Sequence, residues 1–198
     1  MRAISLWQPW ATLLVAGWKA VETRSRPIPG CLIDQPTAIH AARKRPTDGM
    51  MLGCARAWEL AADYLKVPQD RGLEERLHMA RELIPYGAVV GTVSFLPCGQ
   101  ITGQIIDARP RTPGVHLGYR ELALWVPVVL EDETYTRFVI REQDRDLGFF
   151  DEGRFVWPVR HALAIAVPVP AHGHRGPWHL EREVDDLVQA QIRTATSA

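Results

Sequence analysis

The segment from Ala162 to Val169 constrains the fold more than any other part of the chain, because its side chains alternate in size. Large residues occupy the odd positions and small residues the even ones: Leu163, Ile165, Val167 and Val169 against Ala162, Ala164 and Ala166. An alternation with a period of two predicts a β-strand with a bulky face and a tight face. Such a strand suits the wall of a small β-barrel that has another element packed close outside it.

The N-terminal part of the chain predicts a strand, a short helix and two more strands. A strand that ends near Leu6 is followed by Pro9, and proline suits the first turn of a helix because its missing N–H is not needed there. Gly17 then provides a natural C-terminal stop for that helix. We expect strands at residues 20–24 and 37–41.

The middle of the chain predicts further strands. Residues 87–96 are rich in β-branched side chains and indicate a central strand, in which Gly91 marks a bulge or a close approach of another backbone. Residues 122–130 and 135–140 are expected to pair across the acidic segment 131–133.

Three amphipathic segments indicate helices, at about residues 50–65, 73–84 and 180–195. The elements together predict an α+β fold in one domain spanning residues 1–198. That domain would be a small β-barrel of about five to seven strands flanked by helices. The first two helices form a helical insertion at about 45–86, and the third is a C-terminal helix.

Composition excludes several classes of protein. Lysine and arginine number 23 and aspartate and glutamate also 23, so the chain lacks the positive field of proteins that coat nucleic acid nonspecifically. No run of about 18 apolar residues could span a membrane, and the N-terminus lacks the pattern of a secretory signal. The three cysteines are scattered, without zinc spacing or an even count for disulfides. We therefore expect a cytoplasmic protein with reduced thiols and no membrane association.

Several motifs resemble those of ASCH domains, named for activating signal cointegrator homology, in the PUA-like superfamily. The first are Ile4-Ser5-Leu6-Trp7-Gln8-Pro9-Trp10-Ala11 and Gly17-Trp18-Lys19-Ala20-Val21-Glu22-Thr23-Arg24. The others are Ile39-His40-Ala41-Ala42, the strand from Gly87 to Cys98, Gly153-Arg154-Phe155-Val156-Trp157, and the proline- and glycine-containing segment from Pro168 to Trp178. Thr23 and His172 depart from the family, where asparagine and lysine are common. The resemblance implies a PUA-like barrel whose cleft accepts RNA or a nucleobase.

A charged cluster is the main candidate for a site. In a strand Glu22 and Arg24 point to the same face, about 6.5 to 7 Å apart, and Lys19 enters from the preceding turn. Two cations and a carboxylate would then converge beside the first helix, where a phosphate or a polarised carbonyl fits. The alternative is an exposed ion-pair cluster worth about 0 to 1 kcal/mol. The resemblance favours the cleft.

Other residues could complete a binding surface for a nucleotide. Trp7, Trp10, Trp18 and Trp157 are candidates for stacking on a base, although buried tryptophans are more often core. Gln8 is expected to line the cleft, and His40 either donates to a ligand or caps a buried carbonyl. Arg43, Lys44 and Arg154 are candidate phosphate contacts, or simply solvated side chains.

Three functions remain open at this point. The leading hypothesis is a module that binds RNA, single-stranded nucleic acid or a modified nucleoside through this cleft. The second is an enzyme with Lys19 and Glu22 as catalytic residues, because the resemblance extends to amidohydrolases of acylated cytidine and to metal-dependent ribonucleases. The third is a protein-interaction module in transcriptional coactivation. No cofactor is expected and no metal site either, since His116, His161, His172 and His174 do not form a recognisable ligand pattern.

Overall fold

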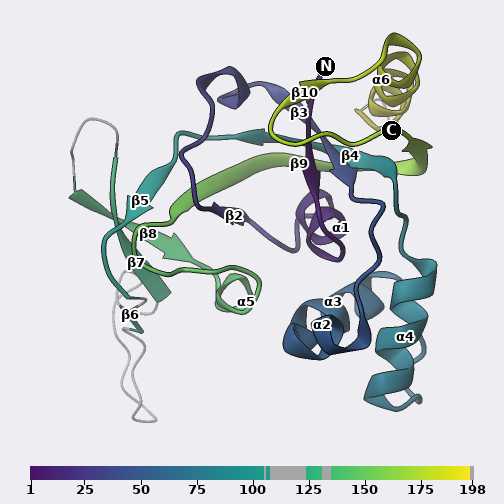
Figure 1. Cartoon of the computed structure of the whole chain (residues 1–198), viewed down its shortest axis with the longest axis horizontal. Helices are drawn as coiled ribbons and strands as arrows, with labels where there is room; N and C mark the ends of the chain where they lie inside the picture. Colours follow the sequence, from purple (N-terminus) through teal and green to yellow (C-terminus); the bar gives the residue numbers. More distant parts are fainter. Residues whose placement is uncertain (105, 108–123, 131–134, 197–198) are drawn as a thin grey trace.

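The computed structural model describes residues 1–104, 106–107, 124–130 and 135–196 (Figure 1). The helices in these residues are α1 (Trp10–Val15), α2 (Asp48–Gly53), α3 (Ala55–Tyr64), α4 (Leu73–Leu83), α5 (Glu142–Arg145) and α6 (Arg182–Thr196), with a 3-10 turn at Gly30–Leu32. The strands are β1 (Arg2–Leu6), β2 (Val21–Arg24), β3 (Pro36–Ala41), β4 (Ala88–Phe95), β5 (Gly99–Ile101), β6 (Ile106–Asp107), β7 (Leu124–Val129), β8 (Tyr135–Ile140), β9 (Phe155–Pro170) and β10 (Trp178–His179).

The strands form one curled sheet in the order β10-β1-β3-β4-β9-β5-β7-β6, to which β2 is added on β9 and β8 on β7. All described pairings are antiparallel except that of β1 with β3. Seven of the ten described strands are four residues or longer. The predicted α+β fold, a half-barrel sheet of about that many strands with helices around it, is confirmed.

The 16-residue strand β9 lies between β4 and β5 and joins the two parts of this sheet. Its C-terminal part pairs with β4, and its N-terminal part pairs with β2 and β5 (Figure 1). The tight face predicted from the alanines exists, because Ala162 and Ala164 pack against the central core. Ile165 on the bulky face is buried beside α6, whereas Val167 is exposed. The alternation thus predicted the strand correctly, but not the burial of every large residue in it.

Gly91 marks the close approach expected within β4. The pairing of β4 with β9 shifts register between Val89 and Gly91. A Cβ atom at Gly91 would lie 2.3 Å from the carbonyl oxygen of Leu163 and 2.8 Å from Cβ of Val15 in α1. Helix α1 is therefore seated directly on the sheet at a point where only glycine leaves room.

The helices between β3 and β4 differ in one respect from the prediction. The segment expected as one helix at about 50–65 is two helices, because Cys54 between them leaves the helical conformation at φ −135° and ψ 40°. Trp58 and Leu77 are buried in the core that these helices share. The C-terminal helix α6 lies close to its expected bounds and packs Val188 against the sheet.

The predicted pairing of the strands at 122–130 and 135–140 is confirmed, with β7 and β8 in register from Leu124 opposite Ile140 to Val129 opposite Tyr135. Residues 122–123 and the acidic segment 131–133 lie outside the described residues. Within the part of the chain that the structure describes, no helix has the length and apolar character that crossing a membrane requires.

Candidate functional site: a charged cavity beside the first helix

A cavity of about 230 Å³ lies where the end of β1, the start of α1, strand β2 and the segment before β9 meet. Its lining consists of Ser5, Leu6, Trp7, Trp10, Lys19, Glu22, Thr23, Arg24, Leu147, Phe149 and Arg154. Trp7 and Phe149 are 39% and 62% exposed, so the cavity reaches the surface between aromatic side chains. We call this the β2 cavity.

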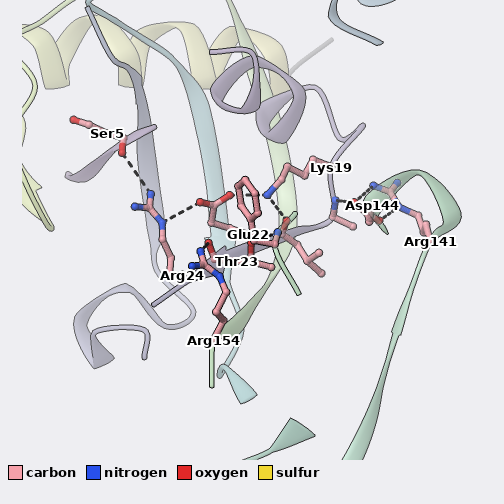
Figure 2. A network of polar contacts seen from close by, with 11 residues as sticks. Ser5, Lys19, Glu22, Thr23, Arg24, Arg141, Asp144 and Arg154 are labelled. Atoms are coloured by element: carbon pink, nitrogen blue, oxygen red, sulfur yellow. Dashed lines mark hydrogen bonds and ion pairs between the residues drawn. The ribbon is translucent and has the colours of Figure 1, made fainter. Parts of the chain in front are cut away.

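The floor of the β2 cavity is a chain of three charges. Nζ of Lys19 donates to Oε2 of Glu22 and to the carbonyl oxygen of Val21, both at 2.6 Å. Nε of Arg24 lies 2.9 Å from Oε1 of Glu22, so each carboxylate oxygen faces a cation (Figure 2). The side chain of Lys19 is 1% exposed and that of Glu22 10%, whereas that of Arg24 is 36% exposed. The predicted convergence of Lys19, Glu22 and Arg24 is therefore present, and it is buried rather than a surface ion-pair cluster.

Local structure explains how Lys19 enters the floor. Helix α1 ends at Val15, and two residues later Gly17 has a φ of +75°, the left-handed conformation that favours glycine. The backbone N–H groups of Trp18 and Lys19 both donate to the carbonyl oxygen of Leu13, at 3.0 Å. This cap turns the chain sharply into β2 and directs the lysine side chain under the strand.

Arg154 and Phe149 form the opposite wall of the cavity. The backbone N–H of Phe149 donates to Oγ1 of Thr23 at 2.9 Å, and Nη2 of Arg154 donates to the carbonyl oxygen of Thr23 at 3.3 Å. The guanidinium of Arg154 lies 5.6 Å from the centre of the Phe149 ring. Thr23 thus fixes both residues beside the floor, and the exposed ring of Phe149 lies next to the cation of Arg154.

The tryptophans expected to stack on a base are divided among three environments. Trp7 and Trp10 line the β2 cavity, and Nζ of Lys44 lies 5.2 Å from the Trp7 ring, which places this lysine at the rim. Trp18 does not line the cavity, because it packs edge-on against Tyr64 of the helical insertion.

Trp157 is a core residue that supports the floor from below. It is 6% exposed, packs edge-on against Phe95, and donates its Nε1–H to the carbonyl oxygen of Arg26 at 3.1 Å. The guanidinium of Arg24 lies 5.8 Å from its ring centre. Trp157 is absent from the cavity lining because Arg24 lies over it.

Gln8 has a structural role that accounts for all of its polar atoms. Its Nε2 donates to Oγ1 of Thr12 and to the carbonyl oxygen of Pro85, both at 2.8 Å. Its Oε1 accepts from the backbone N–H of Thr12 at 3.2 Å. Gln8 therefore joins α1 to the chain after α4 and does not line the β2 cavity.

His40 and Arg43 lie in a different cavity, contrary to expectation. They line a space of about 540 Å³ together with Tyr86, Gly87, Pro170, Ala171, His172, Gly173, Glu181 and Val184. His40 is 2% exposed, with Nδ1 3.1 Å from the hydroxyl of Ser5 and Nε2 3.2 Å from the carbonyl oxygen of Ala171. The prediction that His40 shares a concavity with Lys19, Glu22 and Arg24 is wrong, because strand β1 intervenes at Ser5. Burial lowers the pKa of His40, and the nearby His174 and His172 lower it further against the opposing effect of the Ala171 carbonyl.

Among the described residues, no group of three or more histidine, cysteine, aspartate or glutamate side chains could hold a metal ion. His116, which was considered as a ligand, lies outside the described residues. Within that same part of the chain, the ionic groups of the β2 cavity are Lys19, Arg24, Arg154 and Glu22.

Sequence reasoning did not find the wall formed by Phe149 and Leu147. These residues are more than 120 positions from β2 and belong to no motif, so nothing local in the sequence signals their place in the site. The one indication is composition: two adjacent aromatic residues, Phe149 and Phe150, stand shortly before Gly153-Arg154.

Comparison with known proteins gives a likeness in fold only. No family model and no curated protein matches the chain. Among solved structures the chain is similar to ASCH from Zymomonas mobilis and to two point mutants of that protein, at 16% identity in each case and with TM-scores of 0.42, 0.40 and 0.41. Each alignment covers 96% of this chain and 93%, 94% or 96% of the other. All three are structures of ASCH proteins, the family whose motifs this sequence resembles.

Proposed function

We propose that the β2 cavity binds a single nucleobase, presented by RNA, by another single-stranded nucleic acid or by a modified nucleoside. The observation that carries this proposal is the combination of a buried lysine-carboxylate-arginine floor with exposed aromatic rings at the rim. A base needs a flat apolar contact for its face and polar groups for its edge, and single-stranded RNA is recognised in this way.

The size of the cavity favours a base over a whole nucleotide. Cavities that enclose drug-sized ligands usually exceed about 300 Å³. At about 230 Å³ the β2 cavity admits one ring system and leaves the sugar and phosphate outside. Arg154, Arg24 and the rim residue Lys44 are the cations available to a phosphate held there.

The balance of charges supports binding of an anionic ligand in the β2 cavity, but not over the protein surface in general. Three cationic side chains and one carboxylate line the cavity, so the net charge of the lining is positive. The chain as a whole has equal numbers of basic and acidic residues. Attraction for a phosphate is therefore local, and binding should involve few phosphates and weak salt dependence.

Binding is favoured over hydrolysis by the contacts of the floor. A general base needs a carboxylate oxygen that can reach the substrate proton. Both oxygens of Glu22 already lie against cations, and Nζ of Lys19 is engaged by two acceptors. With these atoms engaged, we expect the floor to bind the edge of a ligand rather than to remove a proton from it.

The test is a titration of a fluorescently labelled short single-stranded RNA, and of DNA of the same sequence, followed by anisotropy at several salt concentrations. Arg24→Gln and Arg154→Gln should each weaken binding about tenfold, because each removes a charged hydrogen-bond donor worth about 1.5 kcal/mol. Arg182→Gln is the matched control, since its side chain is 95% exposed on α6, away from the cavity. Equal binding by the parent and an Arg24→Gln/Arg154→Gln double variant at matched salt would remove the proposal.

The same samples address catalysis and the choice of ligand. The parent chain is incubated with N4-acylated cytidine and with labelled RNA, with and without magnesium or manganese, and the products are separated by chromatography. We expect binding without turnover. Product formation that depends on Lys19 would replace the binding proposal with a hydrolase.

A further inference from the structure

The turn that carries Lys19 is held by Asp144 of helix α5 and by Arg141 directly before that helix, two residues that no motif includes. Oδ1 of Asp144 accepts from the backbone N–H of Ala20 at 2.8 Å. Nη1 of Arg141 donates to the carbonyl oxygen of Gly17 at 3.1 Å, and its Nη2 donates to that of Trp18 at 2.9 Å. The turn from Gly17 to Ala20 is therefore held by hydrogen bonds on both sides of Lys19. Figure 2 shows Asp144 and Arg141 side by side.

The side chains of Arg141 and Asp144 also hold each other in place. Nε of Arg141 donates to Oδ2 of Asp144 at 2.6 Å, and its Nη2 lies 3.2 Å from Oδ1. Asp144 is 1% exposed, whereas the side chain of Arg141 is 45% exposed. Gln143 adds a donor to the carbonyl oxygen of Trp18. A buried carboxylate whose oxygens are shared between a guanidinium and a backbone N–H has little freedom to move.

The turn needs such support because its own structure is irregular. Between α1 and β2 the chain passes through the left-handed Gly17, and the carbonyl oxygens of Gly17 and Trp18 and the N–H of Ala20 lie outside α1 and β2 and need other partners. Arg141 and Asp144 supply those partners from a position more than 120 residues away.

We propose that Arg141 and Asp144 are positioning residues for Lys19: they hold its turn so that the ammonium stays under β2, against Glu22, in the floor of the β2 cavity. The expected effect on ligand affinity rests on the proposed function, whereas the positioning of Lys19 does not. Loss of the hydrogen bonds from Arg141 and Asp144 lets the turn open, which exposes Lys19 and moves it away from the edge of the ligand.

A labelling experiment tests the geometry without any ligand. The chain has three lysines, and Lys44 and Lys66 are exposed, so they serve as internal standards. Reductive dimethylation of the native protein, followed by peptide mass spectrometry, should modify Lys19 about tenfold more slowly than either standard. In Asp144→Ala the Lys19 rate should rise severalfold while the rates of Lys44 and Lys66 stay constant. Asp144→Asn should fall between, because its remaining oxygen still accepts from Ala20.

Arg141→Gln guards against failure of the aspartate variants to fold, because the arginine is half exposed and Asp144 keeps its hydrogen bond from Ala20. It too should raise the Lys19 rate selectively. A Lys19 rate that stays constant relative to Lys66 in Arg141→Gln and in Asp144→Asn would overturn the proposal. General unfolding would expose Lys19 without changing the two exposed standards, so circular dichroism of each variant must match that of the parent before its Lys19 rate is compared.

A double-mutant cycle on RNA affinity then connects these hydrogen bonds to the site. If Asp144 acts through Lys19, Asp144→Asn weakens binding severalfold in the parent and has no effect once Lys19→Met is present. Equal weakening in both backgrounds would overturn the positioning role. A parent chain that binds neither RNA nor nucleoside would refute the proposed function, while the labelling result would still decide whether Arg141 and Asp144 position Lys19.

Discussion

Replacing Glu22 by glutamine should destabilise the fold far more than an ordinary ion-pair change. The carboxylate lies 2.6 Å from Nζ of Lys19, and the two side chains are 10% and 1% exposed. Removal of one partner of a buried pair leaves the other charge without compensation, which typically costs about 3 to 5 kcal/mol. Glutamine keeps one oxygen acceptor, so we expect about 3 kcal/mol for Glu22→Gln.

The matched control is Glu75→Gln on helix α4. Glu75 lies 2.9 Å from Nη1 of Arg71, and both side chains are 51% exposed. Such a pair contributes about 0 to 1 kcal/mol. Urea unfolding followed by circular dichroism measures both variants. With a slope of about 2 kcal/mol per molar urea, Glu22→Gln should lower the midpoint by about 1.5 M and Glu75→Gln by less than about 0.5 M.

A second substitution separates an unpaired charge from simple loss of packing. Lys19→Met removes the buried cation and keeps a side chain of similar length. The Lys19→Met/Glu22→Gln double variant should be more stable than the sum of the single effects predicts, by about 1 to 3 kcal/mol. The reasoning is refuted if Glu22→Gln behaves like Glu75→Gln, or if the two single effects simply add.

Three other perturbations address packing, pH and the rim. Gly91→Ala should lower the free energy of unfolding in urea by about 2 to 3 kcal/mol, because the new Cβ meets the backbone of Leu163. Gly49→Ala in α2 is the control: its Cβ meets nothing within 4 Å, and it should stabilise the protein by about 0.5 to 1 kcal/mol. Equal effects of the two variants would contradict the close packing of α1 on the sheet. The pKa of His40 is lowered in the folded state, so the unfolded chain binds a proton there more readily, and stability falls as the pH drops below about 6.5. His40→Gln should therefore reduce the change in the urea midpoint between pH 7.5 and 5.5. An unchanged pH dependence of the midpoint would count against this account. Phe149→Ala should weaken RNA binding about tenfold by anisotropy if a base stacks there, whereas Leu187→Ala, similarly exposed on α6, should leave it unchanged.

The charged floor could be predicted because its determinants are local. Strand alternation places Glu22 and Arg24 on one face whatever the rest of the fold does, and the glycine that ends α1 brings Lys19 to the same side. Burial of the cluster could not be predicted in the same way. The residues that cover it, Leu147 and Phe149, approach from a part of the chain whose sequence carries no periodic signal.

The position of His40 could not be predicted from the local sequence, because it depends on how its strand pairs with distant strands. Its strand, β3, runs parallel to β1 with His40 opposite Ser5, and its pairing with β4 shifts register between Ile39 and His40. The His40 side chain meets the hydroxyl of Ser5, its partner in this parallel pairing, while Arg24 reaches the carbonyl oxygen of Ser5 at 3.5 Å. One residue of β1 thus separates two cavities that the sequence suggested were one.

The register of β2 on β9 decides which aromatic residues can meet a ligand. Glu22 pairs with Trp157 and Arg24 with Phe155, and directly opposed residues in an antiparallel pair share a face. Trp157 therefore lies on the cavity side of the sheet, yet Arg24 covers its ring and is held there by Glu22. A ligand that draws the Arg24 guanidinium toward a phosphate would uncover an indole directly beneath a base. The floor and the aromatic contacts of the β2 cavity are for this reason linked, and substitutions at Arg24 and Trp157 should not act independently on binding.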